Sequence, residues 1–193
     1  MEILLYLTGI TLLLITTIII LKINSLKNII YKKPDILSDK KILIIYYSGI
    51  GNSKSVAEKL HTIVGGDIKE IELVEKYPSN IFTMSKLIRK QMKTGYLPQI
   101  NEYDISDYDV IFVGSPVWNF SISLPVQAFL KNNNFENKIL IPFFTCSGGV
   151  NKNKVINNIK NSTKAKDIKK PAYLFENGIF LIKEQLIKWL NNI

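Results

Sequence analysis

A short loop rich in hydroxyl, amide and glycine residues carries the clearest chemical signal in the sequence. It reads Ser48-Gly49-Ile50-Gly51-Asn52-Ser53. A continuous apolar run, 42–47, precedes it and is typical of a strand buried on both faces of a parallel sheet. A helical pattern follows directly, so the loop surrounds one point with backbone N–H groups and a positive dipole end. That arrangement suits a bound phosphate. The alternative is a strand-to-helix turn that needs glycines for its backbone conformation and binds no ligand.

The spacing within this loop excludes two common kinds of phosphate site. The P-loop of ATPases ends in Gly-Lys-Ser/Thr, whereas Lys54 here comes after the serine. The dinucleotide-binding motif Gly-x-Gly-x-x-Gly needs a third glycine at the position that Lys54 occupies. The loop therefore favours a monophosphate held by hydroxyl groups and backbone amides.

Two further turns follow apolar runs that predict buried strands. The first of them reads Gly114-Ser115-Pro116-Val117-Trp118-Asn119-Phe120, and the second reads Thr145-Cys146-Ser147-Gly148-Gly149. Trp118 and Phe120 are unusually apolar for a surface loop. A planar conjugated ligand stacked on Trp118 would explain them, and packing beneath a neighbouring loop is the alternative. The glycine-rich third turn can present several N–H groups in one direction.

The sequence offers little for thiol, acid–base or metal chemistry. Cys146 is the only cysteine and His61 the only histidine. His61 falls in the middle of a predicted helix, with no reason to face the thiol, so we do not expect a nucleophilic Cys–His pair. We name no catalytic residue and no metal ligand.

Strand-like and helix-like segments alternate along residues 41–193 and must position these turns. The predicted strands are 41–47, 67–73, 109–114, 138–144 and 171–175. The predicted helices are 54–64, 79–93, 121–132, 151–160 and 181–192. This alternation predicts an α/β fold, a doubly wound five-stranded parallel sheet with helices on both faces. Ligands of such sheets bind beyond the carboxyl ends of the strands, where the three turns would meet.

The N-terminal segment predicts a transmembrane helix ahead of this domain. Residues 3–21 carry no charge, and a helix of this length is about 28 Å long, close to the ~30 Å bilayer core. A signal peptide is the alternative, but no lysine or arginine precedes the run and no cleavage site follows it. We expect an anchor at 1–21, a polar linker at 22–40 and a domain at 41–193. Lysines after the span place that domain in the cytoplasm, on a single-pass cell-membrane protein.

The charge balance alone does not assign a partner. The formal net charge is +9, and residues 41–193 hold 20 basic and 13 acidic groups. The lysines are scattered, and no basic stripe is interleaved with aromatic residues, so we do not expect nucleic-acid binding. A positive face would suit a domain held near an anionic membrane leaflet.

The three turns, taken together and in order, resemble those of the flavodoxin-like family. Residues 48–53 are similar to the family's phosphate motif Thr/Ser-x-Thr-Gly-Asn-Thr/Ser, with Ile50 in place of the central threonine. Residues 114–118 resemble Gly-x-Pro-x-Trp, whose aromatic residues flank the flavin ring, although Asn119 stands where a second aromatic residue often follows. Residues 144–149 resemble the loop at the pyrimidine end of the flavin. The resemblance covers residues 41–192.

This resemblance implies the strand order 2-1-3-4-5 and non-covalently bound FMN. The implied cofactor-binding residues are Ser48, Gly49, Ile50, Gly51, Asn52, Ser53, Pro116, Val117, Trp118, Asn119, Phe120, Thr145, Cys146, Ser147, Gly148 and Gly149. It also implies a membrane-anchored protein that carries electrons between redox partner proteins or reduces a small acceptor such as a quinone. The alternative is a cofactor-free interaction module of the same fold, tethered to the membrane.

Overall fold

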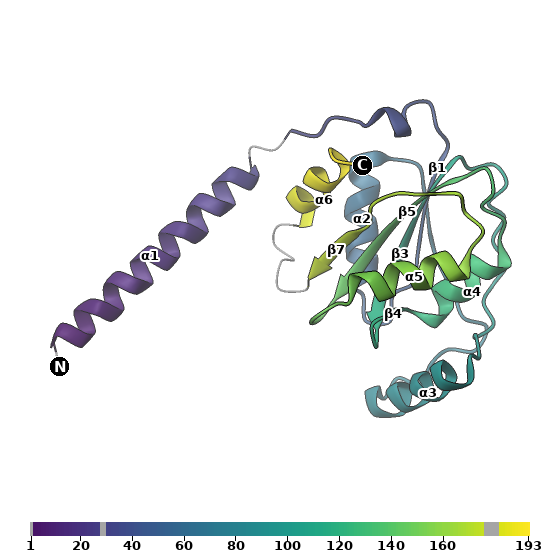
Figure 1. Cartoon of the computed structure of the whole chain (residues 1–193), viewed down its shortest axis with the longest axis horizontal. Helices are drawn as coiled ribbons and strands as arrows, with labels where there is room; N and C mark the ends of the chain where they lie inside the picture. Colours follow the sequence, from purple (N-terminus) through teal and green to yellow (C-terminus); the bar gives the residue numbers. More distant parts are fainter. Residues whose placement is uncertain (1, 28–29, 176–181) are drawn as a thin grey trace.

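The computed structural model describes residues 2–27, 30–175 and 182–193, and it shows a twisted, mainly parallel sheet flanked by helices (Figure 1). The strands are β1 (Ile42–Tyr46), β2 (Asp67–Glu70), β3 (Val110–Trp118), β4 (Ser121–Ile122), β5 (Ile139–Cys146), β6 (Asp167–Ile168) and β7 (Ala172–Phe175). The helices are α1 (Glu2–Lys27), the short 3-10 helix η1 (Asp35–Leu37), α2 (Asn52–Val64), α3 (Ile81–Thr94), α4 (Leu124–Asn132), α5 (Lys152–Ser162) and α6 (Ile182–Leu190).

Two apolar layers cover the two faces of the sheet, which confirms the doubly wound α/β architecture. Every residue of β1 is buried. Because side chains alternate along a strand, Leu43 and Ile45 pack toward α4 and α5, whereas Ile44 and Tyr46 pack toward α2 and α6. Burial on both faces is why this strand reads as an unbroken apolar run.

The sheet order is β2-β1-β3-β5-β6, and β7 also pairs with β5. The first four strands follow the predicted order, but the sheet has seven strands within the described residues instead of five. The predicted strand 171–175 appears as β7, and β6 is an additional short strand that precedes β7 along β5. Pro171 separates the two because it has no N–H to donate to the ladder.

The second additional strand, β4, lies where a helix was predicted to begin. The prediction placed a helix over 121–132, but α4 starts at Leu124. Residues Ser121 and Ile122 instead turn back and pair antiparallel with Trp118 and Val117 of β3. The loop predicted after 114 is therefore a strand end followed by a tight hairpin.

The N-terminal region differs from its prediction in two respects. Among the residues that the structure describes, no helix has both the length and the hydropathy needed to cross a membrane. The transmembrane helix predicted for 3–21 is thus not found there, and residue 1 lies outside the description. Residues 30–40, predicted as part of a polar linker, pack on the domain. Leu37 is fully buried against the α2 and α6 layer, and Asn191 donates from Nδ2 to the carbonyl of Ile30 over 2.9 Å.

Candidate functional site

The carboxyl ends of β1, β3 and β5 lie at one edge of the sheet and bring the three predicted turns together. In the parallel register Tyr46 lies opposite Gly114, Gly114 opposite Phe143, and Pro116 opposite Thr145. The Tyr47 N–H donates to the Gly114 carbonyl over 3.1 Å and continues this pairing past the end of β1. The predicted convergence of the turns is therefore observed.

The first turn is built as a cradle in front of α2. Ser48 Oγ accepts a hydrogen bond from the Gly51 N–H over 3.1 Å. Gly51 has a φ of 94°, which glycine adopts without strain, and it is the N-cap residue of α2. Gly51 has no side chain with which to cap this helix, whereas Asn80 caps α3 and Asn151 caps α5. The start of α2 therefore suits an anion from outside the chain.

A buried hydrogen bond joins the first turn to the third. Ser53 Oγ and Thr145 Oγ1 are 2.8 Å apart, and both residues are buried. The structure extends β5 through Cys146, so Thr145 and Cys146 belong to the strand and the third turn begins at Ser147. Cys146 is only 3% exposed, and its thiol lies within the apolar layer under α5.

The second turn has an unusual backbone. Asn119 and Phe120 have φ angles of 48° and 61°, and they connect the paired residues Trp118 and Ser121. Two positive φ values in a two-residue hairpin are typical of a type I′ turn, which favours Asn-Gly. A phenylalanine in this conformation costs about 1–2 kcal/mol. The Phe120 side chain is nevertheless 47% exposed, and Lys154 Nζ lies 5.9 Å from its ring centroid.

Trp118 lies in an aromatic cluster over the first turn. Its ring makes edge-to-face contacts with Tyr47 at 5.6 Å and with Tyr77 at 5.9 Å between centroids. A Cβ atom on Gly49 would lie 3.9 Å from Trp118 Cζ2, so the indole closes one side of the phosphate-type cradle. Sequence reasoning missed Tyr77, because its segment between β2 and α3 carries no motif.

A cavity of about 470 Å³ opens beside this cluster, between the first turn, the end of β2 and the start of α3. Its volume falls within the range of small-ligand sites. Burial, reinforced by the negative charge of Glu70, raises the pKa of the Tyr47 phenol to about 12. Burial likewise raises the pKa of Tyr77 far above its usual value. Both phenols are therefore neutral near pH 7, and the wall of the cavity stays uncharged at these positions.

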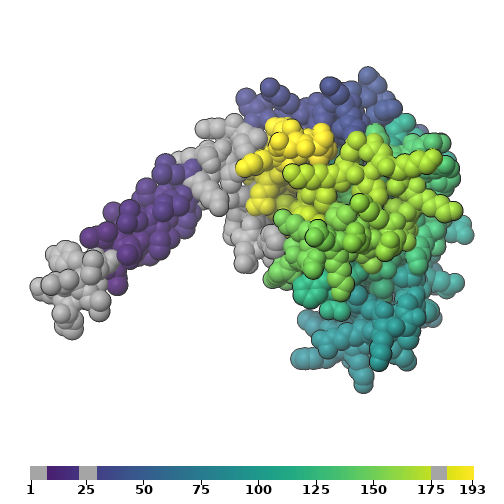
Figure 2. Space-filling model, viewed as in Figure 1, coloured from purple at the N-terminus to yellow at the C-terminus, as the bar shows by residue number. Residues whose placement is uncertain are grey.

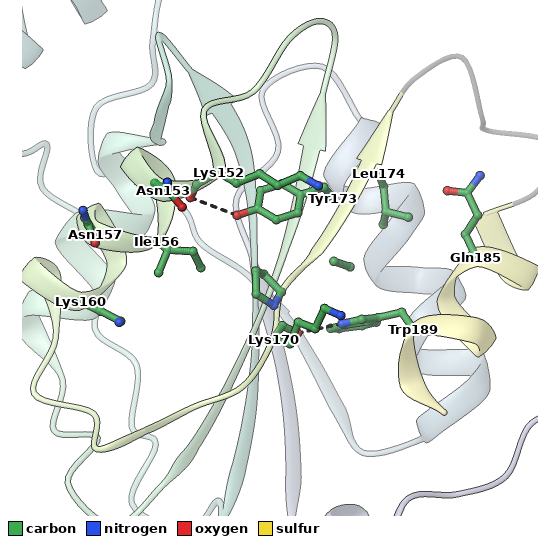
Figure 3. A pocket seen from close by; sticks show the side chains of 12 residues that line it. Lys152, Asn153, Ile156, Asn157, Lys160, Lys170, Tyr173, Leu174, Gln185 and Trp189 are labelled. Carbon is green, nitrogen blue, oxygen red and sulfur yellow. Dashed lines mark hydrogen bonds between the residues drawn. The ribbon is translucent and has the colours of Figure 1, made fainter. Parts of the chain in front are cut away.

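A larger cavity, about 730 Å³, lies between α5, β7 and α6 (Figure 3). Its lining includes Tyr173, whose hydroxyl donates to the Lys152 carbonyl over 3.3 Å, and Trp189, whose Nε1 donates to the Lys170 carbonyl over 2.9 Å. None of the residues predicted to bind a cofactor lines it. We therefore place the candidate site at the sheet edge, where the three turns meet.

Comparison with known proteins identifies the family. A family model described as flavodoxin matches residues 41–193. The chain belongs to the flavodoxin family. The match begins one residue before β1 and covers the whole sheet, so the three turns of this chain lie within it. No curated protein matches the chain.

Solved structures show the same fold. A flavoprotein from Bacteroides eggerthii is 26% identical, with a TM-score of 0.64, and the match covers 80% of this chain and 98% of that one. A flavoprotein from Lactobacillus acidophilus, solved in complex with FMN, is 26% identical with a TM-score of 0.59, over 69% of this chain and 93% of that one. A flavoprotein from Bacteroides uniformis is 21% identical with a TM-score of 0.66, over 78% and 97% of the two chains, and supports the fold alone.

Proposed function

We propose that this protein binds FMN non-covalently at the edge where β1, β3 and β5 end, and that it transfers electrons through the bound FMN. The observation that carries the proposal is the convergence of the three turns, joined by the Ser53–Thr145 hydrogen bond. The FMN bound to the Lactobacillus acidophilus flavoprotein, which shares the fold, supports the same cofactor here.

The phosphate end of FMN fits the first turn. The hydroxyl groups of Ser48 and Ser53 and the uncapped start of α2 supply the hydrogen-bond donors and positive dipole that a phosphate requires. Ile50, 73% exposed, supplies no hydroxyl group where the family motif has a threonine. Backbone amides and two serines would therefore hold the phosphate.

The ring end of FMN fits the aromatic wall. Tyr47 and Tyr77 line the cavity of about 470 Å³, and Trp118 packs edge to face against both of them. Bound FMN supplies the redox chemistry, so no acid or base from the chain is required. The residues of the third turn would orient the polar edge of the ring, and the aromatic wall would exclude water from one side.

FMN uptake by the purified full-length protein tests this proposal. We expect the protein to be yellow, or to become so after FMN is added and excess is removed. Ser53→Ala removes the buried hydrogen bond to Thr145 Oγ1 and the hydroxyl proposed to face the phosphate. A hydrogen bond to a charged phosphate is worth about 1.5–3 kcal/mol, so the Kd should rise roughly 10- to 150-fold. The matched control is Ser106→Ala, which removes an exposed hydroxyl before β3 at the opposite edge of the sheet. Colourless protein that takes up no FMN would instead favour a cofactor-free interaction module.

We also propose that the partner is either a redox protein or a small acceptor such as a quinone. The excess of basic over acidic groups in residues 41–193 favours a partner or surface that carries negative charge. Mixing the FMN-loaded protein with reduced nicotinamide dinucleotide and a soluble quinone separates the two roles. Rapid turnover would support a reductase, and its absence would support an electron carrier that needs a protein donor.

We further propose that the N-terminal segment holds the domain at a cell membrane, with the domain on the cytoplasmic side. Residues 3–21 carry no charge, and the described side chains of α1, at positions 8–21, are all exposed. Apolar side chains on a helix require cover, and a bilayer provides it. In bacterial cells the full chain should sediment with membranes and need detergent for release. A variant lacking residues 1–27 should stay in the supernatant, and a full chain found there would contradict the proposal.

A further inference from the structure

A third cavity, which we call the basic groove, lies on the α4 and α5 side of the sheet. It has a volume of about 440 Å³ and is bounded by α3, α4, α5 and the β3–β4 hairpin. α3, drawn in teal, lies at the lower end of the domain in Figures 1 and 2, and its residues Arg89, Met92 and Lys93 line one side of the groove. Four cationic side chains line it, and no carboxylate does: Arg89, Lys93, Lys131 and Lys154.

The four cations have no acidic partner within the described part of the chain. The ion pairs found there involve other lysines, such as Lys166 with Glu136, and none of these residues lines the groove. Like charges that share one hollow repel one another, and the repulsion is strongest where protein walls displace water. A bound anion would remove this repulsion and would gain charge-assisted hydrogen bonds.

Neutral polar side chains line another part of the groove, and hydrogen bonds hold three of them in place. Ser121 Oγ donates to Asn158 Oδ1 over 2.8 Å, and Gln127 Nε2 donates to the Ile122 carbonyl over 2.9 Å. Because its Oδ1 is engaged, Asn158 keeps its NH₂ group as a donor, and that group has no hydrogen bond to the described residues. The groove therefore offers fixed donors as well as charge.

We propose that the basic groove binds a phosphorylated small molecule that carries at least two negative charges, such as a diphosphate. Its concave shape and volume suit a small ligand better than the flat face of a protein. The groove reaches Asn119, whose hairpin turn also carries Trp118 of the candidate flavin site. A ligand there would lie beside the flavin without competing for the cradle at Ser48 and Ser53.

Calorimetric titration of the full-length protein, loaded with saturating FMN at low ionic strength, tests this site with inorganic pyrophosphate and ADP as probes. We expect one binding event for each probe, weakened about tenfold by Arg89→Gln and by Lys131→Gln, because each substitution removes one charged hydrogen-bond donor. The matched control is Lys90→Gln, which removes the same charge from the same helix but does not line the groove. All three side chains are exposed, so the variants should fold.

The outcomes separate this proposal from that of FMN binding. If Lys90→Gln weakens pyrophosphate binding as much as Arg89→Gln and Lys131→Gln do, the attraction is a general effect of charge and the proposed site is overturned. The absence of any pyrophosphate binding would also overturn the proposal. Binding that is weakened by Ser53→Ala but not by Arg89→Gln would overturn it too, because the anion would then occupy the cradle. If the protein takes up no FMN yet binds pyrophosphate with the expected sensitivity, the groove stands and the flavin site fails.

Discussion

Replacement of Gly114 by alanine is expected to lower the free energy of unfolding by about 2–3 kcal/mol, the upper part of the range for overpacked cores. Gly114 lies in β3 between Tyr46 of β1 and Phe143 of β5. A Cβ atom there would lie 2.5 Å from Phe143 Cε2 and 2.8 Å from Tyr46 Cβ. Neither neighbour can withdraw easily, because each belongs to a strand paired with β3. Since β3 ends in the turn that carries Trp118, FMN affinity should fall as well.

Urea denaturation followed by circular dichroism measures this change. Gly148→Ala is the matched control, because a Cβ atom at Gly148 would meet no heavy atom within 4 Å and its φ is not positive. The control should unfold at nearly the parental urea concentration. Equal free energies of unfolding for Gly114→Ala and Gly148→Ala would contradict the prediction, because the sheet would then accommodate the extra methyl group with little loss of stability.

Phe129→Ala should destabilise the domain by about 3–5 kcal/mol, the usual cost of truncating a buried phenylalanine. Phe129 lies on α4 and is fully buried. Its ring meets Tyr103 and Phe135 edge to face, at centroid distances of 5.9 Å and 5.8 Å. Removal of the ring leaves a cavity that Tyr103 and Phe135 cannot fill, because each belongs to a separate segment of the chain that holds it in place.

The same denaturation experiment checks this prediction, with Phe82→Ala as its control. Phe82 also lies on a helix, α3, but its side chain is 87% exposed. We expect the control to change the unfolding free energy by less than about 0.5 kcal/mol, as is usual for surface substitutions. A small effect of Phe129→Ala would mean that α4 moves inward to close the cavity.

The elements with strong local signals were predictable from the sequence. The apolar run 42–47 identified β1, because a strand covered on both faces cannot alternate with polar residues. The predicted helix 54–64 ends where α2 ends, because the next residue, Gly65, is the C-cap residue and takes a φ of 73°. The motif in the first turn was also local, and its position at the start of α2 follows from the same short segment.

The features that depend on distant contacts were not predictable. Phe120 gave no sign of a left-handed backbone, because the usual signal for such a hairpin is a glycine. Tyr77 joins the site only through its contact with Trp118, far along the chain. The cations of the basic groove come from three separate helices, so no sequence pattern unites Arg89, Lys131 and Lys154.

The enclosure of Cys146 gives this chain a built-in reporter. It is the only sulfhydryl in the sequence, and it lies in β5 where the strand meets the third turn. A water-borne alkylating reagent can attack it only in those molecules whose β5 end has transiently opened. The labelling rate would thus measure how often the end of β5, on which cofactor retention depends, opens to solvent. The measurement needs neither a dye nor an engineered residue.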